Sequence, residues 1–318
     1  MENNLNLSRE RNYVSLAPHL RSKDTVQRIM LDVIIALIPA LIGSIYFFGI
    51  RALYLTITCV VCAVASEYVY QKLAKKEVQI KDLTAVVTGI LIAFNLPASA
   101  PLWMGAFGSV FTIIIVKECF GGVGNNFMNP ALAARIVLMA SWADKMTNYP
   151  AALDAKSGPT PLQLIKAGSF EQLPSIQDMF IGNIGGVLGE TSALLLIIGG
   201  IYLLIRRVIT WRIPVFYIIS TAVFLLLFGI PANILPYEIF GGGLMLGAIF
   251  MATDYSTCPE NNTGKIIFAV IAGLITALIR VKASLPEGVS YSICLMNAAT
   301  PLIDRLTKRS AYGEAKTK

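Results

Sequence analysis

The sequence has little charge and almost no histidine. Charged residues make up 14% of the 318 residues, and His19 is the one histidine. A soluble domain of this length needs more charge on its surface, so the composition excludes that class. A lone histidine makes no metal site, and we predict no metal ligands. Residues 1–28 are polar, without the apolar core of a signal peptide, so no cleavable leader is expected.

Cysteine is also scarce. The five cysteines do not form the framework of a small secreted domain. Cys59 and Cys62 stand three residues apart, which places both thiols on one helix face, where they could serve a metal or an iron–sulfur cluster. We favour the simpler interpretation, because buried cysteine is most often a small apolar side chain.

Long apolar runs dominate what is present. The chain is 55% hydrophobic, with a mean hydropathy of +0.66. Runs near membrane-spanning length predict an all-α integral membrane protein with about ten transmembrane helices. The expected spans are 29–49, 52–70, 83–96, 102–116, 129–142, 187–205, 213–228, 239–253, 266–279 and 289–303.

The distribution of Lys and Arg predicts an orientation. With the amino terminus in the cytoplasm, 19 of the 26 Lys and Arg fall in cytoplasmic intervals, six fall outside, and Arg135 lies within a span. Cytoplasmic loops of membrane proteins are enriched in these residues, so both termini are expected inside. The same rule explains the net charge of +7 without nucleic acid, and no nucleic-acid partner is predicted.

The order of spans divides the chain into five regions. They are a cytoplasmic arm (1–28), a first membrane repeat (29–142), an external loop (143–186), a second membrane repeat (187–304) and a cytoplasmic tail (305–318). The sequence FMNPA at 127–131 matches LMNAA at 295–299, and AFN at 93–95 matches ATD at 252–254 more weakly. With five spans each, the second repeat must be inverted relative to the first, as in many transporters.

Several spans in matching positions are short. Short spans suggest broken helices whose ends meet near the membrane centre, where ions or cofactors bind. Asn129 and Asn297 are the matching polar residues; they either coordinate an ion or flavin or satisfy broken-helix backbone, and the sequence leaves both open. Asp254 follows Thr253 at the cytoplasmic end of a short span. Its carboxylate could bind a hydrated cation or relay a proton, and the alternative is a helix-terminal Asp at the interface.

Arg135 lies nearly two turns into the fifth span. An arginine at that depth needs an anionic partner, and a flavin phosphate or a carboxylate would serve. A purely structural ion pair is the open alternative.

The polar stretch DAKSGPTPL at 154–162 lies in the only long interval between the two groups of spans. Gly158 and the two prolines predict a tight, exposed turn that presents the hydroxyl of Thr160. Taken alone, the stretch is typical of a solvated loop.

Together these motifs resemble a known family. It contains the D subunit of the Rnf complex, an ion-translocating ferredoxin:NAD oxidoreductase, and the B subunit of the sodium-pumping NADH:quinone oxidoreductase. The resemblance covers essentially the whole chain. It includes residues 18–19, 35–40, 121–135, 241–243, 251–254 and, above all, 154 with 157–162.

The resemblance implies FMN joined through its phosphate to Thr160 by a flavin transferase. Pro159 stands where the family usually has Ala. Riboflavin, as a second and non-covalent flavin, is a further expectation of the resemblance. Further candidates for the cofactor site are Asp154, Ser157, Gly158, Asn129 and Arg135, and candidates for an ion pathway are Asp254, Thr253 and Asn297.

The resemblance also implies a function and partners. The chain would carry electrons in the cell membrane of a prokaryote and couple them to Na⁺ or H⁺ transport. Other Rnf-type membrane, iron–sulfur and flavin subunits would handle ferredoxin and NAD. The glycines at 121–124 are no dinucleotide fingerprint, because no βαβ unit is predicted around them.

Two other functions remain open from the sequence. The first is that of the B subunit of the quinone-reducing pump, although that subunit has a longer amino-terminal arm than the one here. The second is a channel or solute transporter without redox chemistry, since an inverted repeat does not fix function. A covalent flavin would discriminate between redox and non-redox function.

Overall fold

The structure is a computed structural model that describes residues 24–149, 158–190, 192–283 and 287–308. Within these ranges the chain is helical, and the sole β contact is an isolated antiparallel bridge between Pro97 and Val187. The predicted all-α class is therefore confirmed for the described part of the chain.

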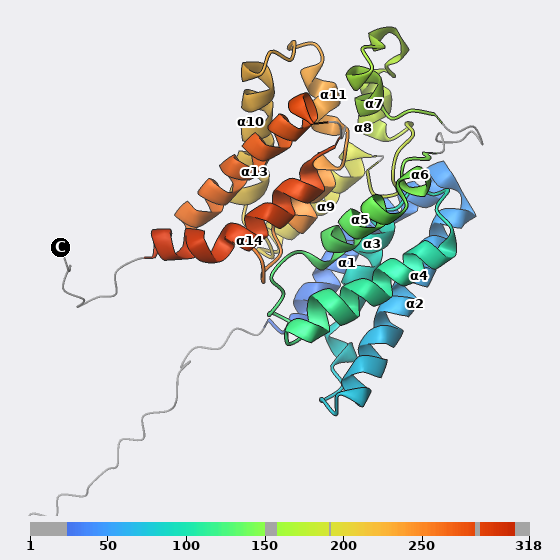
Figure 1. The fold of residues 1–318 in the computed structure, drawn as a ribbon, viewed down its shortest axis with the longest axis vertical. Helices are drawn as coiled ribbons and strands as arrows, with labels where there is room; N and C mark the ends of the chain where they lie inside the picture. The colour runs from blue at the N-terminus through green and yellow to red at the C-terminus, as the bar shows by residue number, and fades with distance from the viewer. Residues whose placement is uncertain (1–23, 150–157, 191, 284–286, 309–318) are drawn as a thin grey trace, which may run out of the picture.

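The first group of helices lies on one side of the molecule (Figure 1). It contains α1 (Val26–Phe48), α2 (Ile50–Leu73), α3 (Thr84–Phe94), α4 (Leu102–Phe111) and α5 (Pro130–Ser141). After α4 the same helix continues through the π-helical turn η2 (Thr112–Lys117) and the 3₁₀ turn η3 (Glu118–Phe120). It thus runs past the predicted end at 116, because Lys117 and Glu118 are buried against partners on α2 rather than exposed.

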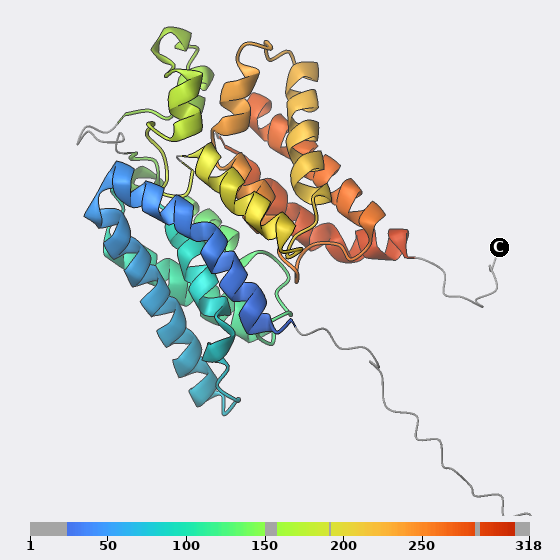
Figure 2. The same cartoon turned by 180° about the vertical axis from the view of Figure 1, so that it is seen from behind.

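The second group lies beside the first, as both faces of the molecule show (Figures 1 and 2). It contains α9 (Ala193–Ile205), α10 (Arg212–Leu227), α12 (Leu244–Leu246) with its π-helical continuation η5 (Gly247–Met251), α13 (Asn262–Lys282) and α14 (Val289–Thr307). Short elements join the groups or precede α12: α6 (Ala143–Met146), α7 (Pro161–Lys166), η4 (Phe170–Gln172), α8 (Ile176–Ile181) and α11 (Leu235–Phe240).

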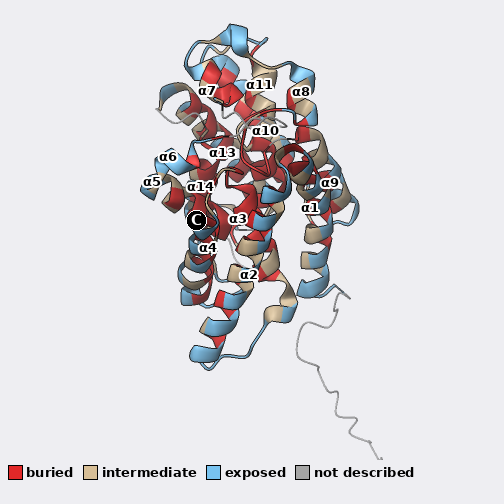
Figure 3. Cartoon of the chain, turned by 90° about the vertical axis from the view of Figure 1, so that its right-hand side faces the viewer, coloured by how far each residue is buried: buried red, intermediate tan, exposed pale blue. Residues whose placement is uncertain are grey.

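Four helices of the described residues are long and apolar enough to cross a membrane. They are α1, α2, the continuous helix from Leu102 to Phe120, and α13; α3, α5, α9 and α10 are shorter apolar helices. Buried residues concentrate between the helices and exposed residues lie on the outer faces (Figure 3). Large apolar side chains such as Ile42 and Val61 are more than half exposed there. This apolar exterior suits lipid, and the chain is a multi-pass membrane protein.

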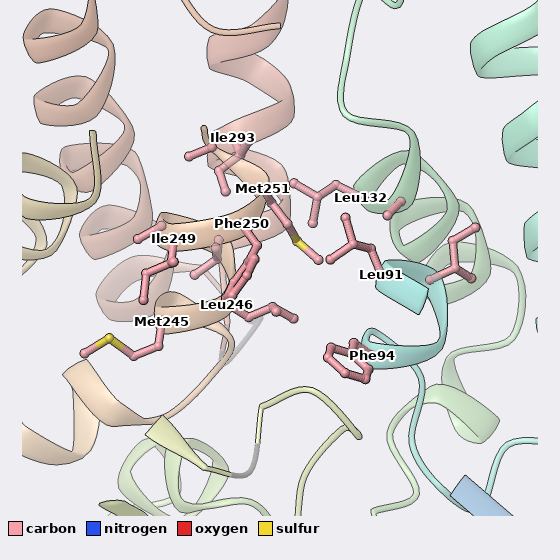
Figure 4. Packing of buried hydrophobic residues seen from close by; sticks show 14 of the residues in the cluster. Leu91, Phe94, Leu132, Met245, Leu246, Ile249, Phe250, Met251 and Ile293 are labelled. Carbon is pink, nitrogen blue, oxygen red and sulfur yellow. The ribbon is translucent and has the colours of Figure 1, made fainter. Parts of the chain in front are cut away.

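The two groups meet where α5 packs against α14 and in two further places. The first is between α1 and α9, where a Cβ added at Gly199 would lie 2.2 Å from the carbonyl oxygen of Ala36. The second lies at the centre, where the short helices end (Figure 4). There Leu91 and Phe94 of α3 face Leu246 and Met251, which belong to α12 and η5. The ends of α3 and of α12 with η5 therefore lie in the core, as expected from their short spans. By contrast, α14 has 19 residues and runs past its predicted end at 303.

Candidate functional site

A cleft of about 360 Å³ opens between the two groups of helices, at the end where α1 begins. We call it the Asp254 cleft. Much of its wall is apolar, from α1, α3 and Phe250. Its polar lining includes Lys117, Asn126, Asn129, Thr253 and Asp254. The structure thus brings three of the predicted site residues, Asn129, Thr253 and Asp254, to one cavity.

Asp254 is held in this cleft by its own loop. One carboxylate oxygen accepts hydrogen bonds from the hydroxyls of Ser256, at 3.0 Å, and Thr257, at 3.2 Å. Thr253 donates its hydroxyl to the carbonyl of Ile249 at 2.6 Å. Asp254 is half-buried and follows the π-helical turn η5. A carboxylate fixed at a helix end and lining a cavity can receive a cation or a proton.

The two matching asparagines lie in contact. Asn129 caps α5: its side-chain oxygen accepts from the N–H groups of Ala131 and Leu132 at 3.0 and 3.2 Å, and its amide donates to the carbonyl of Met251 at 3.1 Å. The Asn297 amide is oriented so that both its oxygen and its nitrogen have partners. In this orientation its oxygen accepts from the backbone N–H of Asn129 at 2.9 Å. Both therefore satisfy the backbone of broken helices, and Asn129 also lines the Asp254 cleft.

A buried ion pair beside the same cleft was not predicted. Lys117 donates to a carboxylate oxygen of Glu67 and to the hydroxyl of Thr84, each at 2.6 Å. Lys117 and Glu67 are almost fully buried, and the second Glu67 oxygen has no partner among the described residues. The sequence shows one charged residue, Glu67 or Lys117, near an end of each of two apolar runs. Only the packing of the helices shows that these two residues meet.

Arg135 lies at the opposite end of the interface between the two groups, and it is 5% exposed. It donates to the backbone carbonyl and the side-chain oxygen of Asn95, each at 3.2 Å, and forms an ion pair with Glu287. The phenol of Tyr149 is buried nearby, and this burial, with the Glu287 carboxylate, raises the pKa of Tyr149. The expected anionic partner of Arg135 is thus a carboxylate that lies just before α14.

A second buried arginine stands next to this pair. Arg280 of α13 donates to a carboxylate oxygen of Glu238 at 3.0 Å and to the carbonyls of Gly241 and Gly242 at 3.2 and 3.3 Å. Glu190 interacts electrostatically with both arginines. We call these five residues the Arg135 cluster: Arg135, Glu287, Arg280, Glu238 and Glu190. Glu190, Glu238 and Arg280 were not predicted as site residues, because single charges near apolar runs do not reveal their partners.

Thr160 is the N-cap of α7. Its hydroxyl accepts from the N–H of Gln163 at 3.3 Å, and the Gln163 side chain accepts from the N–H of Thr160 at 2.9 Å, which is a capping box. Thr160 is 8% exposed, so this part of the loop is packed rather than solvated. The N–H of Gly158 donates to the carbonyl of Tyr149 at 3.0 Å, which ties the loop to the tyrosine that interacts with Glu287 of the Arg135 cluster. Asp154 and Ser157 lie outside the described residues.

Cys59 packs against a glycine, as expected for a small apolar side chain. A Cβ added at Gly105 would lie 2.8 Å from the Cys59 sulfur. Cys59 is buried and Cys62 is half-buried, and both are free thiols.

Comparisons with known proteins cover almost the whole chain. The NQR2, RnfD, RnfE family matches residues 13–313. The chain is similar to the D subunit of the Na(+)-translocating ferredoxin:NAD(+) oxidoreductase complex of Acetobacterium woodii, with 51% identity over 99% of this chain and 98% of that protein. It is 40% identical to the D subunit of the proton-translocating ferredoxin:NAD(+) oxidoreductase complex of Clostridium ljungdahlii, over 94% of this chain and 96% of that protein. It is 35% identical to the D subunit of the ion-translocating oxidoreductase complex of Stutzerimonas stutzeri, over 92% and 93%.

Proposed function

This chain belongs to the NQR2, RnfD, RnfE family, and from that premise we propose how it carries electrons and couples them to ion movement. It is a D subunit of the Rnf type, and so a subunit of a redox-driven ion translocase. Its partners are the other subunits of the complex, which supply the sites for ferredoxin and NAD⁺. Its coupling ion is Na⁺ or H⁺, since one relative is named for each.

The proposed layout is ten membrane crossings in two inverted repeats, 29–142 and 187–304. Each repeat would contribute a short third helix that ends near the membrane centre, α3 in the first and α12 with η5 in the second. The contact of Asn129 with Asn297 supports this layout, because matching residues of inverted repeats meet near the axis that relates the repeats. The termini would then be cytoplasmic, and α7 would lie outside the cytoplasm.

We assign covalent FMN to Thr160, joined by a phosphoester to its Oγ1. The observation that carries this assignment is the position of the SGPT sequence at 157–160. Its threonine is fixed by the capping box, and its glycine is hydrogen-bonded to Tyr149 beside the interface between the repeats. A flavin tethered there would stand at one end of that interface, where fixed charges can tune its redox potential. A flavin transferase would install it.

The Asp254 cleft is the proposed place for a second, non-covalent flavin. Its volume of about 360 Å³ falls in the range of small-ligand pockets, and its apolar wall carries few polar groups. Asn126, Asn129 and Lys117 are the groups that would orient polar atoms of a flavin ring. Asp254 and Thr253 would admit the coupling cation from the same side.

Three forms of the chain test the flavin assignment: the wild type, Thr160→Ala and Thr160→Asn. Each is co-expressed with a flavin transferase, denatured, separated on a gel and viewed under ultraviolet light. We expect a fluorescent wild-type band and dark bands for both variants. Asparagine is an effective N-cap but has no hydroxyl, so Thr160→Asn keeps α7 capped while removing the anchor.

The matched control is Thr147→Ala, which changes an exposed threonine before the same loop and should stay fluorescent. A dark wild-type band would refute the redox proposal and favour a non-redox transporter. A bright Thr160→Asn band would refute the anchor alone.

A further inference from the structure

The charges of the Arg135 cluster do not balance. Arg135 is paired with Glu287, and Arg280 is paired with Glu238. Glu190 is the carboxylate left over, and it is 6% exposed. If all five groups are ionised, they carry one net negative charge. Lys166 also interacts with Glu238, but it lies exposed at the surface. The buried charge on Glu190 is costly unless a cation neutralises it.

Neither oxygen of Glu190 has a hydrogen-bond partner among the described residues. The backbone N–H of Val187 interacts favourably with the carboxylate, but it does not meet the distance and angle of a hydrogen bond. The terminal nitrogens of both arginines are engaged elsewhere, while the Nε of Arg280 also lacks a partner within that part of the chain. Buried carboxylates are normally satisfied, so two open oxygens on one buried side chain leave room for a water or an ion. The excess negative charge favours a ligand that supplies positive charge.

The backbone around Glu190 is built to hold it in place. The N–H groups of Leu188 and Gly189 each donate at 3.0 Å to carbonyls at the end of α3. On the other side lies Gly243, where an added Cβ would be 3.3 Å from Glu190 Oε1. The carboxylate therefore faces bare backbone, with no side chain at Gly243 to fill the space.

Two small cavities lie around the Arg135–Glu287 pair. One, of about 10 Å³, is lined by Asn95, Gly242 and Gly243 together with the pair, and this is room for about one water-sized particle. The other, of about 50 Å³, is lined by Tyr149 and Tyr291 together with the same pair. Arg135, Glu287 and Ser290 line both cavities. The smaller cavity borders Glu190 through Gly243, and the larger one lies beside Tyr149, to which the Thr160 loop is hydrogen-bonded.

We propose that Glu190 binds a single monovalent cation, a proton or Na⁺, and that the Arg135–Glu287 ion pair gates its access from the side of the Thr160 loop. Carboxylate and carbonyl oxygens are the donors that hard cations prefer. One bound charge neutralises the cluster, and opening the ion pair would join the two cavities. This inference rests on the proposed ion transport, and it places a second acidic site at the end of the interface opposite Asp254.

Glu190→Gln tests the proposal in the purified complex, because it removes the charge and keeps the shape. We expect the cation concentration for half-maximal ferredoxin:NAD⁺ turnover to rise about tenfold, the scale of one lost charge contact. The fluorescent flavin band on Thr160 should persist. The control is Glu171→Gln, which changes an exposed carboxylate in η4 and should leave the cation dependence unchanged.

Carbodiimide labelling of the wild-type complex identifies the cation, since the reagent attacks protonated carboxyls in apolar surroundings. Labelled Glu190 is located by peptide mass spectrometry. Protection by Na⁺ would assign Na⁺, whereas labelling that falls with rising pH and ignores Na⁺ would assign a proton.

If the Glu190→Gln complex has the same cation dependence as the Glu171→Gln control, the proposed cation site at Glu190 is wrong, whatever the labelling result. The proposed function would survive that outcome, provided that the wild-type complex is flavinylated and transports ions. If the wild-type complex does neither, the proposed function itself fails.

Discussion

The two ends of the interface between the helix groups are built in opposite ways. The Asp254 cleft is roomy, at about 360 Å³, and its acid is satisfied by hydroxyls of its own loop. The Arg135 cluster borders a cavity of about 10 Å³ through Arg135 and Glu287, and each of its two arginines is paired with an acid on another element. One end is thus open with a locally held acid, whereas the other is closed by ion pairs.

This difference bears on how an ion could cross the subunit. A roomy cleft lets a hydrated cation approach an acid before losing its water, whereas a closed cluster demands full desolvation and close charge balance. The interface would therefore have an easy entrance at one end and a gated passage at the other. Such asymmetry suits a pump, in which the two ends must not be open together.

The largest expected effect comes from breaking the Arg135–Glu287 ion pair at the closed end. Arg135→Gln leaves the carboxylates of Glu287 and Glu190 without that arginine, and stranding a buried charge costs about 3–5 kcal/mol. The thermal stability of the purified complex should fall sharply. Arg135→Gln with Glu287→Gln should recover part of the loss, because the stranded charge is removed. A double variant no more stable than the single variant would show that the pair does not couple energetically.

The open end should respond in function rather than in stability. Asp254→Asn is expected to lower ion-coupled turnover about tenfold, because the amide cannot bind a cation or proton as a carboxylate does. Flavin attachment at Thr160 should persist, as seen by gel fluorescence. Glu260→Gln, which changes an exposed acid nearby, is the control. Unchanged transport in Asp254→Asn would remove Asp254 from the mechanism.

The smallest expected effect comes from a substitution at Gly243, which lies beside Glu190 at the closed end. Gly243 has φ +66°, and an added Cβ would approach Glu190. Gly243→Ala should cost about 1 kcal/mol of stability from backbone strain and should also shift the cation dependence of turnover. Gly229→Ala shares the strain, at φ +92°, but its Cβ would meet nothing within 4 Å. If the two variants have the same cation dependence, the space beside Glu190 is not part of the site.

Much of the fold and part of the site could be predicted from the sequence. The apolar runs indicated the membrane helices, and the ATD sequence at 252–254 singled out an acid that lines the cleft between the two helix groups. The need of Arg135 for an anion was predicted, but not its partner, because Glu287 lies 152 residues away. The capping box of Thr160 was missed although its Thr-x-x-Gln signature was readable.

The surroundings of Glu190, Glu67 and Lys117 could not be predicted from the sequence. Hydropathy and length are local properties, so the sequence by itself determined that this chain forms apolar helices in a membrane and that a family motif sits between two groups of them. The free energy of a buried charge depends instead on which groups surround it in space. Only the tertiary structure decided that Lys117 meets Glu67, that Arg135 meets Glu287 and that Glu190 is left without a hydrogen-bond partner among the described residues.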